Sequence, residues 1–251
     1  MVSDSVLNTS PLITVGITCF NAAATIERAL DSSLAQDWPN LEVLIVDDGS
    51  TDGSREILAR RASVDPRVRV IEHSANRGCA NARNTLVQAA RGEFMAFFDD
   101  DDVSRKDRVR LQHALIIAYE RGVGTNLVAC YASGKRVYPN GYVIPIRAVG
   151  ADGPPPVGHV MVDYLLYNRI CDDVFYGAGA PTCSMMARTG LFRDLGGFDN
   201  AMRRQEDVDF AIRLGFKSGH FIGIPETVLT QYATDGRHKN ALVEFESFMQ
   251  L

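Results

Sequence analysis

Short apolar runs alternate with helical periods over roughly the first half of the chain. The apolar runs are rich in β-branched and aromatic residues and are bounded by turn signals, which is typical of buried strands. Four such strands are predicted, at 13–19, 41–46, 68–72 and 94–98. Apolar residues recur at helical spacing between them, and predict helices at 24–36, from Thr51 or Asp52 through Leu58, at 80–90 and at 105–121. This alternation predicts an α/β fold with a mostly parallel, Rossmann-like sheet flanked by helices.

The alternation loosens after Gly124, which indicates a smaller region of mixed structure. Pro139-Asn140-Gly141 predicts a hairpin turn, because Asn-Gly tolerates positive φ. Further strands are predicted at 127–131, 135–138, 142–146, 180–186, 221–224 and 228–232, and helices at 159–168, 189–195 and 205–217.

Four consecutive carboxylates follow the predicted strand 94–98: Asp99, Asp100, Asp101 and Asp102. Ligands of open α/β sheets bind beyond the carboxyl ends of the strands, so this cluster is placed where a site is expected. Asp99 and Asp101, one residue apart, could hold a hard divalent cation and leave positions for substrate phosphates. A solvated acidic turn is the alternative. An EF-hand is not indicated, since Ser104 occupies the sixth loop position that requires glycine.

Two further acidic groups stand at element ends. Asp47 and Asp48 close the predicted strand 41–46, where an aspartate could accept from a pyrimidine N–H or a ribose hydroxyl; a β-turn with an Asx cap is the alternative. Glu206 and Asp207 open the predicted helix 205–217. Acidic residues favour helix N-termini on electrostatic grounds alone, but Asp207 lies off the apolar face and could accept a proton from a hydroxyl.

The composition is that of an ordinary globular protein, 46% hydrophobic and 23% charged. The net charge of −5 argues against a nucleic-acid binder held by a basic face. Five scattered cysteines without a CxxC pair predict no structural zinc site or disulfide framework, and fit a reducing compartment. The sequence predicts neither a signal peptide nor a membrane-spanning run. The final residues, ALVEFESFMQL, have the pattern of an uncompleted amphipathic helix, as expected for a chain cut from a longer protein.

Five segments together resemble the family 2 glycosyltransferases with the GT-A fold. The segments are ITVGITCFNAAATIERALDSSLAQ, LEVLIVDDGSTDGS, NRGCANARN, GEFMAFFDDDD and LGGFDNAMRRQEDVDFAIRLGFKSG. They stand in the family's order and at its usual spacing, and the resemblance covers about residues 12–235. It implies one continuous GT-A domain, with a nucleotide-sugar-binding half at 1–125 and an acceptor-binding half at 126–251.

The resemblance also implies roles for individual residues. For the nucleotide sugar, Thr18 and Asn21 would cradle the nucleotide, Asp48 would contact uracil, Arg83 would lie near the nucleotide or its phosphates, and Asp99, with Asp100, would lie near the ribose. Asp101 would be nearest the metal, Mn²⁺ or Mg²⁺, with Asp99 and His238 as further candidate ligands, although TDGRHKN departs from the family's spacing around its histidine.

The implied reaction is an inverting transfer from a nucleoside-diphosphate sugar, with a UDP-sugar expected, to a hydroxyl of a glycan or lipid-linked glycan. Asp207 would be the general base, supported by Glu206. The family makes a role in cell-envelope polysaccharide synthesis the expected one, in the cytoplasm, with peripheral association at the inner face of the membrane left open.

Three other functions are weighed against this one. Residues 94–103 also fit the phosphatase pattern of the haloacid dehalogenase type, with Asp99 as nucleophile and Asp101 as acid, but that pattern belongs on a first strand. A nucleotidylyltransferase would need a glycine-rich N-terminal loop, which VGITCFNAAAT lacks. A non-catalytic sugar-binding module would need no base, so the joint presence of Asp99, Asp101 and Asp207 speaks against it.

Six tyrosines of the second half could stack on sugar rings or simply pack: Tyr131, Tyr138, Tyr142, Tyr164, Tyr167 and Tyr176.

Overall fold

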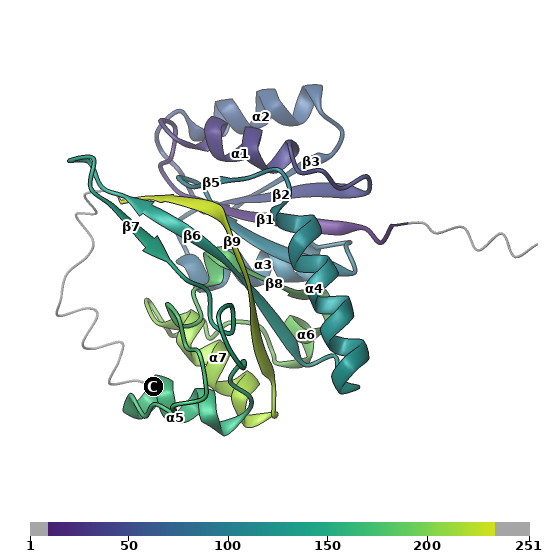
Figure 1. Cartoon of the computed structure of the whole chain (residues 1–251). Helices are drawn as coiled ribbons and strands as arrows, with labels where there is room; N and C mark the ends of the chain where they lie inside the picture. Colours follow the sequence, from purple (N-terminus) through teal and green to yellow (C-terminus); the bar gives the residue numbers. More distant parts are fainter. Residues whose placement is uncertain (1–9, 234–251) are drawn as a thin grey trace, which may run out of the picture.

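One mixed, nine-stranded sheet forms the centre of the computed structural model, which describes residues 10–233 (Figure 1). The strand order is β3-β2-β1-β4-β8-β6-β9-β5, and β7 pairs with β6. The strands of the first half are β1 (Ile13–Cys19), β2 (Leu41–Asp47), β3 (Val68–Glu72) and β4 (Phe94–Asp99). The three pairings among these four strands are parallel, which confirms the predicted Rossmann-like half.

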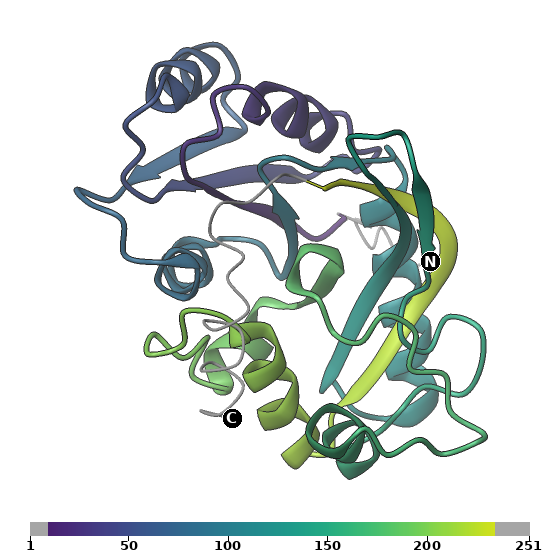
Figure 2. The ribbon, with the colours of Figure 1, turned by 90° about the vertical axis from the view of Figure 1, so that its left-hand side faces the viewer.

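Helices cover both faces of the sheet. They are α1 (Ile26–Leu34), α2 (Ser54–Val64), α3 (Cys79–Ala89), α4 (Arg108–Val123), α5 (His159–Tyr167), α6 (Thr189–Asp194) and α7 (Glu206–Phe216). One buried cluster joins one face of the sheet to α1, α2 and α4, and a second joins the other face to α3, α5, α6 and α7. Figures 1 and 2 show α1 and α2 together at one end of the molecule, and α5 and α7 at the other.

The continuous apolar run of β4 has a direct structural cause. Met95 and Phe97 point into one buried cluster, whereas Phe94, Ala96 and Phe98 point into the other. A strand covered by helices on both faces needs no polar side, so alternation disappears from its sequence.

The second half completes the same sheet with antiparallel and parallel pairs. Its elements are β5 (Val103–Ser104), β6 (Val128–Val137), β7 (Val143–Ile146), the 3₁₀ turn η1 (Thr182–Ser184), β8 (Met185–Arg188) and β9 (His220–Tyr232). β8 is antiparallel to both β4 and β6, so it joins the two halves of the chain in one sheet. The predicted turn at Asn140-Gly141 connects β6 and β7.

Two strands are longer than the sequence predicts. Residues 127–131 and 135–138 are predicted as separate strands but belong to one strand, β6, and 221–224 and 228–232 both belong to β9. The register between β6 and β9 shifts on both sides of Ser133. This bulge accommodates Pro225, and it brings Gly134 so close to β9 that an added Cβ would lie 2.4 Å from the Leu229 carbonyl oxygen. Residues that usually interrupt strands are thus accommodated in an irregular ladder.

Two smaller predictions also fail. The strand predicted at 180–186 begins only at Met185, because η1 precedes it. The two-residue strand β5 was not predicted, since a run this short carries no periodicity. The C-terminal amphipathic pattern, ALVEFESFMQL, lies outside the described residues.

Substitution of Gly49 tests whether the close contact between the turn after β2 and the loop at 75–76 contributes to stability. Its φ is +82°, and an added Cβ would lie 2.5 Å from backbone atoms of Ala75 and Asn76. Gly141 has a similar φ of +81° but open space around it, so it is a matched control. We expect Gly141→Ala to cost about 1–2 kcal/mol for the left-handed backbone alone, and Gly49→Ala to cost about 1–3 kcal/mol more through the backbone clash.

The measurement is urea unfolding of both variants, compared through their midpoints at equal m-value. Equal losses for Gly49→Ala and Gly141→Ala would show that the contact with the 75–76 backbone does not constrain the turn.

Candidate active site

The strand order reverses at β1, so a ligand-binding crevice is expected at the carboxyl ends of β1 and β4. The chain runs from β1 outward through β2 to β3, and α3 then returns it to the other side of β1. Such a reversal is where open α/β sheets bind ligands. Thr18 of β1 is the register partner of Asp99 of β4, and Cys19 is the partner of Asp47 of β2, so three strand ends present their polar residues at one edge.

Asn21 ties the loop after β1 to the loop after β2. Its φ is +51°, and its side-chain oxygen accepts a hydrogen bond from the Thr51 backbone N–H at 2.8 Å. Its own backbone N–H donates to the Ser50 hydroxyl at 2.9 Å. The segment predicted to cradle a nucleotide is therefore a pair of cross-linked loops at the crevice.

Asp48 is buried and holds a third loop. Its carboxylate accepts hydrogen bonds from the backbone N–H groups of Arg77, at 3.0 Å, and Gly78, at 2.8 Å, and contacts Nδ1 of His73 at 2.6 Å. Asp48 thus positions residues 76–78 at the crevice, and contact with a nucleobase stays a prediction. Its neighbour Asp47 accepts from Arg55 Nε at 2.8 Å through Oδ2, while its Oδ1 is buried without a partner among the described residues.

The four carboxylates after β4 are held in different surroundings. Asp100 accepts from the Phe20 backbone N–H, and Asp102 accepts from the Tyr232 backbone N–H, both at 3.1 Å. Burial, together with the neighbouring carboxylates, raises the pKa of Asp100 to about 7 and that of Asp102 to about 8. Burial and Asp101 likewise raise the pKa of Asp99. Full ionisation of the cluster is therefore unfavourable unless a further positive charge is close by.

A group of side chains that could hold a metal ion lies here, and it shares Asp99 with the predicted ligands. Among residues 10–233, ligand atoms of Asp99, Asp102 and Cys183 all lie within 4.8 Å of one another. Carboxylate oxygens suit Mg²⁺ or Mn²⁺, and a divalent cation would favour the ionised form of these buried carboxylates, whereas the thiol is a softer ligand. Asp101 lies in the same turn, and its backbone carbonyl accepts from Arg28 at 2.6 Å. His238 lies outside the described residues.

Arg108 supplies a buried positive charge behind this cluster. Its guanidinium donates to the Phe97 and Cys183 carbonyls at 2.9 Å and to the Ser104 hydroxyl at 3.0 Å. Burial lowers the pKa of Arg108 to about 10. The residue connects β4, η1 and α4, so it holds Cys183 beside the aspartates.

Arg83 links α3 to the start of α7. Its guanidinium forms a buried ion pair with Glu206 and lies over the Phe198 ring, 5.5 Å from the centroid. Its charge acts on both Asp99 and Asp207 and opposes the rise that burial causes in the pKa of each. Asp99 and Asp207 therefore both feel the charge of one arginine, although α7 follows β4 by more than a hundred residues. Glu206 offsets part of the positive charge of Arg83. Contact between Arg83 and a phosphate of the nucleotide stays a prediction.

Asp207 opens onto a cleft of about 560 Å³. Its walls come from the end of α5, from the loop before η1 and from the start of α7. The lining residues are Tyr164, Leu165, Leu166, Tyr167, Asn168, Ala178, Gly179, Ala180, Pro181, Gln205, Asp207 and Val208.

Three participants of this site were not predicted from the sequence. Asp102 is the last residue of the acidic run, and its apolar flank could have suggested burial. Arg108 stands in RVRLQH at the start of a predicted helix and looks like a surface residue. Cys183 carries no local signal, because only the pairing of β8 with β4 and β6 brings it to the aspartates.

None of the helices within residues 10–233 has the length and apolar character needed to span a membrane.

Comparison with known proteins identifies the matching family. Residues 14–174 match the model of the family described as Glycosyl transferase family 2. A curated relative, the succinoglycan biosynthesis protein ExoO of Rhizobium meliloti, is 45% identical over 100 residues, which cover 40% of this chain and 28% of that protein. The curated relatives are matched over only 14–42% of their own lengths.

Solved structures share the fold at lower identity. S. aureus TarS 1–349 in complex with UDP-GlcNAc superposes with a TM-score of 0.67 at 22% identity, over 90% of this chain and 60% of that one. The mannosyltransferase PcManGT from Pyrobaculum calidifontis, in complex with GDP-Man and Mn²⁺, gives 0.61 at 20%, over 92% and 59%. These superpositions confirm the predicted GT-A fold.

Substitution of Asp102 tests whether the ionised acidic cluster destabilises the folded protein when no cation is bound. Asp102→Asn removes one buried negative charge and retains an oxygen that can accept from Tyr232. Ionisation of Asp102 costs stability as the pH rises from its ordinary pKa of 3.8 to about 8, so the neutral variant should be more stable at pH 8 without metal. We expect a gain of about 1 kcal/mol, or about 2–4 °C in Tm for a chain of this size, and loss of the stabilisation that Mn²⁺ gives the wild type.

Thermal denaturation in EDTA and in Mn²⁺ measures both effects, with Asp172→Asn as an exposed control. A lower Tm in EDTA, or an undiminished response to Mn²⁺, would contradict the assignment.

Proposed function

This chain belongs to glycosyl transferase family 2, and we propose that it is an inverting transferase that moves a sugar from a UDP-sugar to a glycan hydroxyl. The observation that carries this proposal is that the charge of Arg83, which is paired with Glu206, acts on the carboxylates of both Asp99 and Asp207. An inverting transfer needs a donor site and a base close to one another, and their shared interaction with Arg83 supports these roles for Asp99 and Asp207. The UDP complexes of TarS support the choice of nucleotide.

Asp207 acts as the general base in this mechanism. Burial raises the pKa of Asp207 although Arg83 opposes the rise, which gives a carboxylate more basic than an exposed one. Its oxygen accepts the proton of the acceptor hydroxyl as that hydroxyl attacks the anomeric carbon. The bond from the anomeric carbon to the diphosphate oxygen breaks on the opposite face, and its electron pair leaves with UDP. Glu206 holds Arg83 in place beside the reacting groups.

The donor side binds and orients the nucleotide sugar. Thr18, Asn21, Asp48 and the 76–78 loop that it positions surround the nucleotide, and Asp99 and Asp100 lie toward the ribose. Asp101, with Asp99 and the newly found Asp102, would hold the divalent cation, Mn²⁺ or Mg²⁺. When bound, that cation offsets the negative charge of the diphosphate leaving group. The Mn²⁺ complex of PcManGT supports this choice of metal.

We place the acceptor in the second half of the chain, at the cleft that Asp207 opens onto, and the donor in the first half. The name of the relative ExoO, a succinoglycan biosynthesis protein, supports a role in polysaccharide synthesis. We propose a polysaccharide of the cell envelope, with a glycan or lipid-linked glycan as acceptor. We propose that the reaction takes place in the cytoplasm, at the inner face of the membrane. The phosphatase alternative is not favoured, because β4 is the fourth strand along the chain.

The donor assignment is tested by thermal denaturation of the full chain with UDP, UDP-GlcNAc, UDP-glucose and GDP-mannose, in Mn²⁺ and in EDTA. A ligand at a hundred times its Kd stabilises by about 2.7 kcal/mol, so we expect a rise of about 5–10 °C for the uridine nucleotides in Mn²⁺ only. UDP release from a UDP-sugar in Mn²⁺ then measures turnover. Absence of both responses would refute the donor class, and a beryllium fluoride adduct on Asp99 would favour the phosphatase.

Asp207→Asn separates donor binding from transfer. The amide cannot accept the proton, so transfer should fall by about 10²–10⁴-fold, while UDP affinity by calorimetry stays within about threefold of the wild type. Asp209→Asn is the matched control, since Asp209 lies on the same helix and pairs with Arg213 at 2.7 Å. If Asp207→Asn loses UDP affinity instead, the residue belongs to the donor site and is not the base.

A further inference from the structure

A buried tyrosine on the face of the sheet that α7 covers has no part in the mechanism proposed so far. Tyr131, in β6, is 1% exposed, and its hydroxyl has no hydrogen-bond partner among the described residues. We infer that Tyr131 is a positioning residue, whose hydroxyl donates a hydrogen bond to the ionised carboxylate of Asp207 and orients that carboxylate toward the acceptor hydroxyl. The inference rests on the proposed function for the role of Asp207 as the base.

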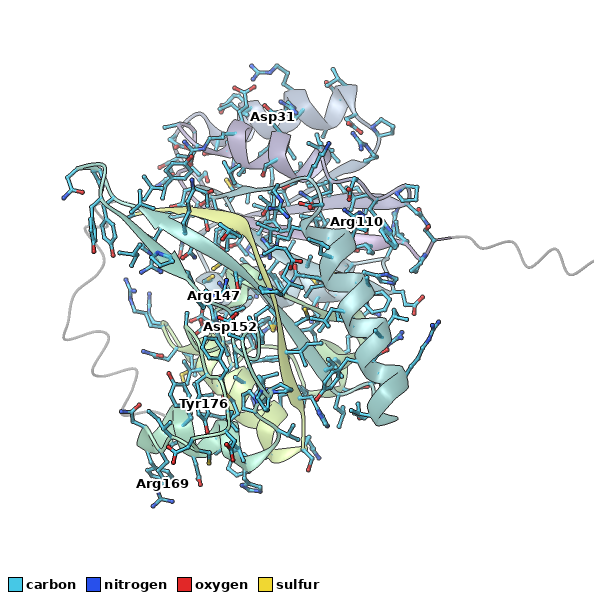
Figure 3. The ribbon with its side chains drawn as sticks, viewed as in Figure 1. Asp31, Arg110, Arg147, Asp152, Arg169 and Tyr176 are labelled. Atoms are coloured by element: carbon cyan, nitrogen blue, oxygen red, sulfur yellow. The ribbon has the colours of Figure 1, made fainter. Side chains whose placement is uncertain are left out.

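The unpaired hydroxyl distinguishes Tyr131 from other tyrosines of the chain. Tyr176, which lies beside α5 (Figure 3), accepts a hydrogen bond from the Cys171 backbone N–H at 3.3 Å. The hydroxyl of Tyr119 contacts Nδ1 of His220 at 3.0 Å. A buried hydroxyl has lost its interactions with water and normally finds a partner in the protein. Phenylalanine would fill the site of Tyr131 without this loss, so the hydroxyl indicates a function other than packing.

The packing of the sheet directs Tyr131 toward the start of α7. Tyr131 belongs to the buried cluster formed with α3, α5, α6 and α7, whereas both of its neighbours in the sequence belong to the cluster on the opposite face. Phe210 and Ala211 of α7 are members of the same cluster as Tyr131. Asp207 precedes them by three and four positions and therefore lies on the same face of the helix. This corrects the expectation that Asp207 lies off the apolar face.

The negative charge of Asp207 reaches the hydroxyl of Tyr131. Burial raises the pKa of Tyr131, and Asp207 and then Cys130 raise it further. The other charged side chains that act on Asp207, within the described part of the chain, are Arg83 of α3 and Glu206 of α7, which pair with each other. A neutral donor can fix the orientation of a carboxylate without neutralising it, and a base held by a further group is the usual arrangement in such sites.

The interaction is tested first by the pKa of Asp207. Tyr131→Phe removes the hydroxyl and keeps the ring. A hydrogen bond to the ionised form lowers the pKa of a carboxyl group, so its loss should raise the pKa of Asp207. Carboxyl ¹³C NMR of the full chain over a pH titration measures this pKa, and Asp207→Asn identifies the signal. An unchanged pKa of Asp207 in Tyr131→Phe would overturn the inference.

The kinetic consequence is tested by sugar transfer at saturating acceptor. Tyr131→Phe should lower kcat by about tenfold, the rate equivalent of one hydrogen bond to a charged group. The KM for the UDP-sugar should stay within about twofold, since the donor site is untouched. Tyr119→Phe is the matched control, because it removes a tyrosine hydroxyl on the opposite face of the sheet, and it should change neither value. A rise in KM alone, or an unchanged kcat in Tyr131→Phe, would contradict a positioning role.

A double-mutant cycle tests whether Tyr131 acts through Asp207. In the Asp207→Asn background, Tyr131→Phe should lower the remaining rate by less than about twofold, because no charged base is left to orient. A second loss of about tenfold in that background would show that the two residues act independently, and the inference would fail.

The NMR measurement needs no turnover and therefore separates this inference from the proposed function. A raised pKa of Asp207 in Tyr131→Phe, with a wild type that transfers no sugar, would retain the interaction of Tyr131 with Asp207 and refute the transferase. Transfer by the wild type with the same pKa of Asp207 in both proteins would retain the transferase and refute the role of Tyr131.

Discussion

The structure depends on a balance of buried charges at the carboxyl end of β4. Four aspartates follow one another there, and burial together with their mutual repulsion raises the pKa of Asp100 and Asp102 far above the usual carboxylate range. Arg108 lies behind them, fully buried, and Arg83 lies beside them. Arg83 also pairs with Glu206, and Arg108 also donates to backbone carbonyls. With both arginines in place the pKa values are still raised, so full ionisation of the cluster needs a further positive charge, which a divalent cation can supply.

The topology of the sheet decides which groups share in this balance. The reversal of strand order at β1 leaves the ends of β1 and β4 open toward a crevice. The antiparallel insertion of β8 between β4 and β6 then carries Cys183 to the same place. The long strand β9 ends at Tyr232, whose backbone N–H donates to Asp102. Both halves of the chain therefore build the site, although the first half contains most of the recognisable motifs.

The two sides of the site differ in electrostatic character. On the proposed donor side, loops cross-linked by Asn21 and Asp48 lie near a cluster of carboxylates that suits a cation and a diphosphate. On the proposed acceptor side, Asp207 is the one charged residue that residues 10–233 contribute to the lining of a cleft of aromatic, aliphatic and amide groups. Arg83 stands between the two sides and acts on the carboxylates of both. This arrangement assigns charge handling to one side and recognition of hydroxyl groups to the other.

The sequence alone determined the elements and motifs that depend on local pattern. The four parallel strands, their connecting helices, the Asp99–Asp102 run and the acidic start of α7 follow from apolar spacing and from residues that stand next to one another. Three features depended on contacts between distant segments, and tertiary structure alone decided them: the uninterrupted β6 and β9, the meeting of Asp102 with Cys183, and the burial of Arg108. The same holds for the tyrosines, since Tyr131 and Tyr176 are buried whereas Tyr167 is open to the cleft. Local sequence fixes which side chains an element carries, but packing decides which of them remain uncovered and which charges come together.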